Sequence, residues 1–174
     1  MKFKIFVAIC FVFLFQTGCA TQRKPIIDVK QQFAIAALQY EDMLLAQHDI
    51  TKFPQSTNPD GNLGYRPAKW WCSGFFGGSL WYIYEFTGEE KWKIAADKWT
   101  KALENEKYDT GTHDLGFKLF CSFGNGYRLT KNKEYVEPLL TGAKSLATRF
   151  HPEYGVIKSW DHYTKCDYPV SLTI

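Results

Sequence analysis

Residues 112–129, THDLGFKLFCSFGNGYRL, decide the fold. The stretch opens with three polar residues after a turn at residues 108–111, and it becomes apolar from Leu115 onward with almost no polar face. A helix that is apolar nearly all round is typically buried. Asp114 therefore lies where a buried helix begins, with His113 beside it. The residue type alone favours an N-cap, which would stabilise the helix by about 1 kcal/mol, over a catalytic role.

A second copy of this pattern lies 42 residues upstream, in residues 70–86, WWCSGFFGGSLWYIYEF. Each copy is followed by a short turn and then by a stripe of apolar residues at helical spacing, the first in residues 92–103 and the second in residues 139–150. Pro138 predicts that the second amphipathic helix begins near Glu137. The repeating unit is therefore a helical hairpin that pairs a buried helix with an amphipathic one.

Alternation of buried and amphipathic helices predicts an all-α fold in two layers, with the buried helices inside. A closed ring of such hairpins is an α/α toroid, and an open stack is an α-solenoid. The glycines of the inner helices each cost about 1 kcal/mol relative to alanine. Close approach of a neighbouring helix or of a ligand would offset that cost. Outside the repeat, the pattern predicts a helix over residues 26–47, a long loop over 51–70 and a short extended piece over 156–162.

Residues 1–19 predict a lipoprotein-type signal peptide. Lys2 and Lys4 precede an apolar run that is too short to span a membrane comfortably, and the Gly18-Cys19 junction resembles a lipoprotein cleavage box. We expect Cys19 to carry the lipid, so that the protein is exported to the periplasm and anchored to a membrane that it does not cross. An ordinary secretory leader is the alternative.

Composition limits the remaining function classes. The chain has 174 residues, with 45% hydrophobic and 17% aromatic content, which predicts one folded domain and excludes disorder. The positive and negative charges of the expected mature chain nearly balance, so no nucleic-acid partner is expected. Cys72, Cys121 and Cys166 lack the spacing of a zinc site, and we expect no metal; they are either paired or free buried thiols.

Four ordered motifs resemble glycoside hydrolase family 88, the unsaturated glucuronyl hydrolases, which include enzymes for unsaturated chondroitin disaccharides. The motifs are Trp71 to Phe75, Ser79 to Trp81, His113 to Phe117 and Val156 to Trp160. The resemblance implies an (α/α)6 toroid and a reaction without cofactor. In that reaction, water adds across the C4–C5 double bond of an unsaturated uronic acid at the non-reducing end, and the glycosidic bond then opens.

The resemblance also implies roles for single residues. Asp114 matches one of the family's two essential aspartates, and Trp71 and Trp160 match aromatic residues that line the sugar site. His113 is expected either to bind substrate or to be a hydrogen-bonded neighbour of the cap. The family's proton donor follows a run like residues 168–174, after which this sequence ends. We therefore expect residues 20–174 to be the N-terminal portion of the toroid, truncated and inactive by itself.

The chemistry agrees with this assignment of Asp114. Hydration of an enol ether needs a general acid and a carboxylate that orients hydroxyl groups or water. A carboxylate at a helix N-terminus is favoured in its charged form, so Asp114 suits the second task better than proton donation. Arg149 and Lys158 are expected to be solvated charges, with contact to the uronate carboxylate as the alternative.

Three functions remain open at this point. The first is a glycosidase that acts on unsaturated uronic-acid oligosaccharides, with membrane contact only through the lipid anchor. The second is a non-catalytic glycan-binding lipoprotein, in which the aromatic residues stack on sugars. The third is an α-solenoid interaction protein.

Overall fold

A computed structural model describes residues 27–159 of the chain. The predictions for Cys19, Trp160, Cys166 and the signal peptide fall outside these residues. The chain divides into a short unit, Met1–Gln32, and a larger unit, Phe33–Ile174, and helix α2 (Val29–Ala46) begins in the first and continues in the second. The elements discussed below belong to the larger unit. They are α3 (Gly74–Thr87), α4 (Glu90–Lys101), the 3-10 helix η1 (Glu104–Tyr108), the π-helix η2 (Gly116–Gly124), α5 (Asn125–Thr130), the 3-10 helix η3 (Lys133–Tyr135), α6 (Val136–Ala147), and the strands β1 (Phe53–Thr57), β2 (Leu63–Arg66), β3 (Phe150–His151) and β4 (Val156–Ile157).

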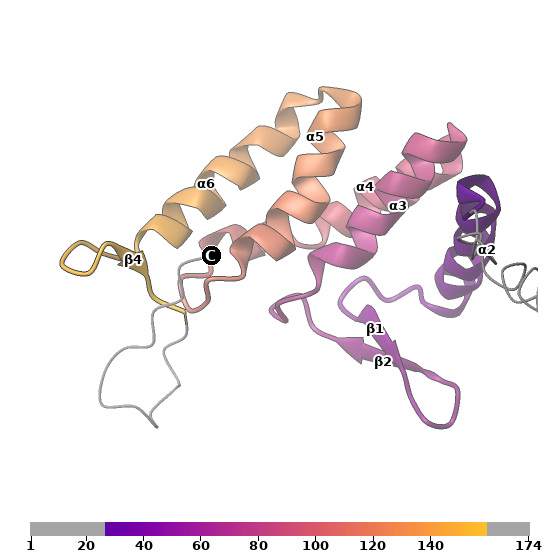
Figure 1. Cartoon of the computed structure of the whole chain (residues 1–174), viewed down its shortest axis with the longest axis horizontal. Helices are drawn as coiled ribbons and strands as arrows, with labels where there is room; N and C mark the ends of the chain where they lie inside the picture. Colours follow the sequence, from indigo (N-terminus) through magenta and orange to yellow (C-terminus); the bar gives the residue numbers. More distant parts are fainter. Residues whose placement is uncertain (1–26, 160–174) are drawn as a thin grey trace, which may run out of the picture. The chain divides into compact units, whose positions relative to one another are not determined.

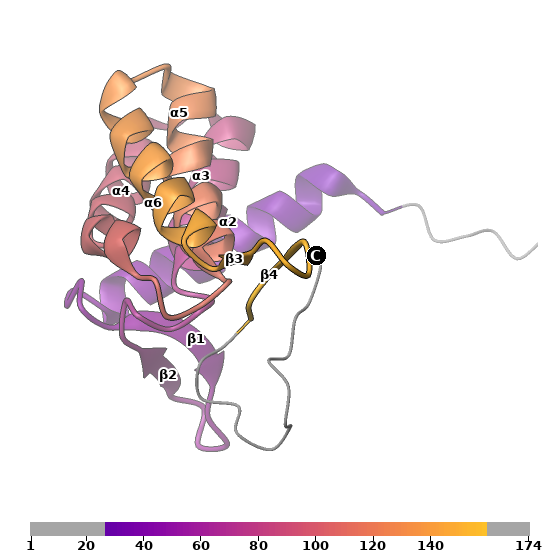
Figure 2. The same ribbon diagram turned by 90° about the vertical axis from the view of Figure 1, so that its left-hand side faces the viewer.

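The two predicted hairpins are present. In the first hairpin α3 packs against α4, and in the second η2, which α5 continues, packs against α6 (Figure 1). The helix α6 begins at Val136, which places Pro138 in its first turn, where the missing N–H does no harm. Figure 2 shows the β3–β4 pair directly after the end of α6. The predicted helical repeat is therefore confirmed.

The two hairpins also share the backbone conformation of the residue that ends their first helix. Gly88 after α3 and Lys131 after α5 are both left-handed, with φ of 71° and 58°, and their N–H groups return to Tyr84 O and Tyr127 O at 2.8 and 2.9 Å. Both helices thus end with the same left-handed cap. Glycine adopts this conformation freely, whereas Lys131 adopts it at a cost of about 1–2 kcal/mol.

The inner elements α3 and η2 approach each other backbone to backbone. A Cβ atom added at Gly74 would lie 2.2 Å from the carbonyl oxygens of Phe117 and Lys118, and one added at Gly78 would lie 2.6 Å from Cys121 O. Close helix approach therefore accounts for these two glycines. Beneath this contact, the core holds Trp81, whose indole N–H donates to Thr100 Oγ1 at 2.9 Å inside the protein.

Three features differ from the sequence-based predictions. The stretch expected to be a loop contains an antiparallel hairpin of β1 and β2, and β3 pairs with β4. The second inner helix is not a continuous α-helix, because η2 is wound as a π-helix before α5 begins. It is also not buried all round, since Phe120 is 68% exposed and Phe117 and Tyr127 are also exposed. Within residues 27–159, no helix is both long enough and apolar enough to cross a membrane.

Candidate active site

Asp114 lies two residues before η2, and its side chain does not cap that helix. Its carboxylate Oδ2 instead accepts the hydroxyl of Thr112 at 2.9 Å, while its backbone N–H donates to Thr112 Oγ1 at 3.1 Å. The backbone oxygen of Asp114 accepts the N–H groups of Phe117 and Lys118. The prediction that the carboxylate caps the helix is therefore wrong, because the helix N–H groups donate to the backbone oxygen of Asp114 and not to its side chain.

His113 is held by the segment that follows β4. Its backbone N–H donates to Ser159 O at 3.2 Å, and its ring atom Nδ1 lies 3.2 Å from the same oxygen. A carbonyl oxygen can only accept, so this contact requires the proton on Nδ1. The other ring nitrogen, Nε2, then lies 3.4 Å from Asp114 Oδ1. The His113 side chain is 10% exposed and the Asp114 side chain 11%.

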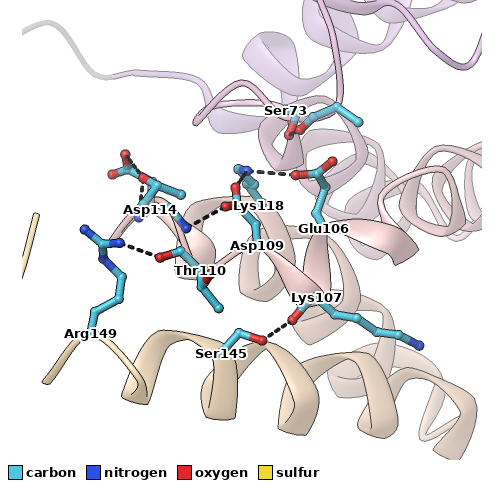
Figure 3. A network of polar contacts seen from close by, with 12 residues as sticks. Ser73, Glu106, Lys107, Asp109, Thr110, Asp114, Lys118, Ser145 and Arg149 are labelled. Carbon is cyan, nitrogen blue, oxygen red and sulfur yellow. Dashed lines mark hydrogen bonds and ion pairs between the residues drawn. The ribbon is translucent and has the colours of Figure 1, made fainter. Parts of the chain in front are cut away.

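A buried lysine fixes the start of the loop that carries these residues. Lys118, in η2, has a side chain that is 0% exposed, and its ammonium lies 2.8 Å from Glu106 Oε2 and 2.7 Å from Asp109 Oδ2 (Figure 3). Burial by itself would raise the pKa of Asp109, but hydrogen bonds from Lys118 and from the N–H of Gly111 outweigh it and hold that pKa below its usual 3.8. The loop is thus tied to η2 by an ion cluster.

Arg149 is the second buried cation beside the loop, and the expectation that it is a solvated charge is wrong. It lies after the end of α6, and its guanidinium donates to the backbone oxygens of Thr110, Lys158 and Ser159. Figure 3 shows Arg149 reaching Thr110 next to Asp114. The roles of Arg149 and Lys118 could not be predicted from the sequence, because each appears there only as a lone cation within or beside an apolar helix.

Three exposed aromatic rings form a surface, and one of them, Phe117, is close to Asp114 in the chain. Trp71, Phe75 and Phe117 are 42%, 39% and 40% exposed, and their ring centroids lie 5.6–5.9 Å apart in edge-on contacts. Phe117 follows Asp114 by three residues, and its backbone N–H donates to Asp114 O at 3.0 Å. The structure therefore brings the predicted Trp71 into contact with Phe117 of η2, the helix that follows Asp114. It also adds Phe75 and Phe117 to this surface, which the sequence suggested only as inner-helix residues.

A cavity of about 670 Å³ adjoins this aromatic surface. Its walls include Trp71 and Phe75, together with Tyr40 of α2 and residues 54–57 of β1, but not Asp114. Trp71 is thus an exposed residue at a concave surface and not a core residue. An aromatic face beside a hollow of this size can stack on a sugar ring.

The remaining groups to consider are the cysteines and the side chains that could bind a metal. Cys72 and Cys121 are free thiols, and burial raises the pKa of both. In residues 27–159, no three His, Cys, Asp or Glu side chains come together as a metal site. Trp160 lies outside the described residues. The backbone oxygen of Lys158 accepts a hydrogen bond from Arg149.

Known proteins provide independent comparisons. No model of a protein family matches the sequence. An unsaturated glucuronyl hydrolase from Formosa agariphila is 34% identical over 153 residues, which cover 86% of this chain and 38% of the relative. An unsaturated chondroitin disaccharide hydrolase from Streptococcus pyogenes serotype M1 is 28% identical over 121 residues, 65% of this chain and 29% of the relative. The chain thus spans well under half the length of these relatives.

Solved structures of unsaturated glucuronyl hydrolases also match this chain. A crystal structure of an unsaturated glucuronyl hydrolase specific for heparin matches 75% of this chain and 35% of its own length, with 40% identity and a TM-score of 0.69. A second, from a Bacillus species, matches with a TM-score of 0.68 at 23% identity over 79% of this chain and 37% of its own, which supports the fold alone. The described hairpins form part of an (α/α)6 toroid, as the resemblance implied. The chain belongs to the unsaturated glucuronyl hydrolases, glycoside hydrolase family 88.

Proposed function

We propose that the protein removes the unsaturated uronic acid from the non-reducing end of oligosaccharides released from glycosaminoglycans or similar polysaccharides. Water would add across the C4–C5 double bond, and the hydrated sugar would then rearrange and open the glycosidic bond. The observation that carries the proposal is Asp114, a mostly buried carboxylate that is not used as a helix cap and is followed one turn later by an exposed aromatic surface.

Asp114 would orient the substrate hydroxyl groups or the attacking water. Its Oδ1 has a described contact only at 3.4 Å, from His113 Nε2, which is long for a hydrogen bond. Contacts of catalytic groups are often long before substrate binds. Trp71, with Phe75 and Phe117 beside it, would stack on the sugar, and His113 would contact the substrate from the same loop.

The test is the loss of ultraviolet absorbance of the conjugated enol acid when an unsaturated glucuronyl disaccharide is added. In the protein from the complete reading frame, Asp114→Asn should lower kcat by about 10²-fold or more, because the amide keeps the shape and loses the charge. Asp60→Asn, in the exposed turn of the β1–β2 hairpin, is the matched control. A near-normal kcat in Asp114→Asn would remove Asp114 from the mechanism.

The exposed aromatic surface favours one other function, a non-catalytic glycan-binding lipoprotein. If that function is correct, the complete protein binds the disaccharide, Trp71→Ala weakens the binding, and no absorbance is lost.

A further inference from the structure

Arg149 joins two segments that are far apart in the sequence. It donates from one guanidinium to Thr110 O on the loop before η2, to Lys158 O at 2.8 Å and to Ser159 O at 3.0 Å after β4. The backbone completes the clamp, because Lys158 N–H donates to Arg149 O at 2.9 Å. The side chain is buried, so these contacts are shielded from water.

The carbonyl of Ser159 is shared between Arg149 and His113. It accepts from Arg149 Nη2, and it also accepts the backbone N–H of His113 and lies 3.2 Å from its ring Nδ1. Arg149 therefore fixes the oxygen that sets the orientation of the His113 ring. Through Thr110 it also fixes the chain four residues before Asp114.

We propose that Arg149 is a positioning residue, which holds the His113–Asp114 pair in its working orientation without touching the substrate. The proposal rests on the proposed function for its link to catalysis. A guanidinium presents its donors in a rigid, planar fork, so it can bind oxygens of two segments at once. An ammonium is compact and cannot span the same three oxygens, so lysine keeps the charge of Arg149 but loses the clamp.

The experiment follows the His113 ring directly. The protein from the complete reading frame is labelled with ¹⁵N in histidine only, and the His113 signal is assigned with His113→Gln. In the wild type the ring proton on Nδ1 should exchange slowly with solvent, and in Arg149→Lys its exchange should accelerate by at least about tenfold. Added guanidinium ion should slow the exchange again in Arg149→Ala. Arg128→Lys is the control, since Arg128 pairs with Glu85 on the exposed side of α3 and α5.

Turnover is measured on the same proteins. Arg149→Lys should lower kcat by about 10–100-fold with a smaller change in KM, because small misplacements of catalytic groups reduce turnover on that scale. An unchanged ring signal in both Arg149 variants would overturn the proposal, as would an altered ring signal with unchanged kcat. Global unfolding of both variants would also overturn it, because Arg149 would then serve the whole fold. If the wild type shows no turnover, the proposed function fails, and the ring signal still decides whether Arg149 orients His113.

Discussion

Replacement of Lys118 by methionine should be among the most destabilising single changes in this part of the fold. The lysine side chain is 0% exposed, and its two carboxylate partners, Glu106 and Asp109, are only 15% and 13% exposed. Methionine fills a similar volume but leaves two negative charges without their cation. Removal of one partner from a buried ion cluster typically costs about 3–5 kcal/mol. Since the carboxylates retain some access to water, we expect a loss near the lower end, about 3 kcal/mol in the free energy of unfolding at pH 7.

The assay is urea unfolding at equilibrium, followed by tryptophan fluorescence. Lys93→Met is the matched control, because Lys93 lies 2.8 Å from Glu90 in an exposed pair and should contribute little. Adding Asp109→Asn to Lys118→Met should restore more than about 1 kcal/mol, since it removes one of the two unpaired charges. A loss below about 1 kcal/mol in Lys118→Met, or no recovery in the double variant, would refute the argument.

The pH dependence gives a second check on the same cluster. The pKa of Asp109 in the folded protein lies below its usual 3.8, so the stability that this group contributes is complete above that value. It is lost as the pH falls through the lowered pKa, because the unfolded state then binds the proton more readily. Without Lys118, burial should instead raise the pKa of Asp109. The destabilisation caused by Lys118→Met should therefore shrink between pH 7 and pH 4, and a constant difference would contradict the ion-pair explanation.

Two further predictions concern the turn after α5 and the lipid anchor. Lys131→Gly should raise the free energy of unfolding by about 0.5–1 kcal/mol, because the left-handed conformation costs lysine more than the extra freedom of glycine costs the folded state. The reverse change at the equivalent turn, Gly88→Lys, should lower it by a similar amount, and equal thermal midpoints for wild type and both variants would disprove this explanation. Cys19→Ser should move the protein from the membrane fraction to the soluble periplasmic fraction; unchanged membrane association would exclude a lipid on Cys19 as the anchor.

The parts of the fold that follow from local chemistry could be predicted from the sequence. The hairpin repeat depends on helical spacing and on turn residues, and both act within a few positions of the chain. Thr87 and Thr130, for example, each return their hydroxyl to the carbonyl four residues earlier, at 2.8 and 2.7 Å, before a left-handed residue. The repeat offset therefore identified both helical hairpins and the position of the short turn in each, but not the left-handed conformation of that turn.

The parts that depend on distant partners could not be predicted. Arg149 bonds to Thr110, 39 residues away in the sequence, and Lys118 bonds to Glu106, 12 residues away. An isolated cation in the sequence is most often solvated, so nothing local identified these two as buried clamps. The winding of η2 as a π-helix was likewise hidden, because its apolar residues fit an α-helix equally well.

The same two cations explain why the site at Asp114 depends on the assembled fold. Its carboxylate does not cap η2, so the helix itself does not hold it in place. The loop is held instead at Asp109 by Lys118 from η2 and at Thr110 by Arg149 from the end of α6. Each cation thus ties one residue of the loop near Asp114 to another part of the fold. Within residues 27–159, the only contact described for Asp114 Oδ1 is the long one to His113 Nε2 at 3.4 Å, so this oxygen can still accept hydrogen bonds from a substrate or from water.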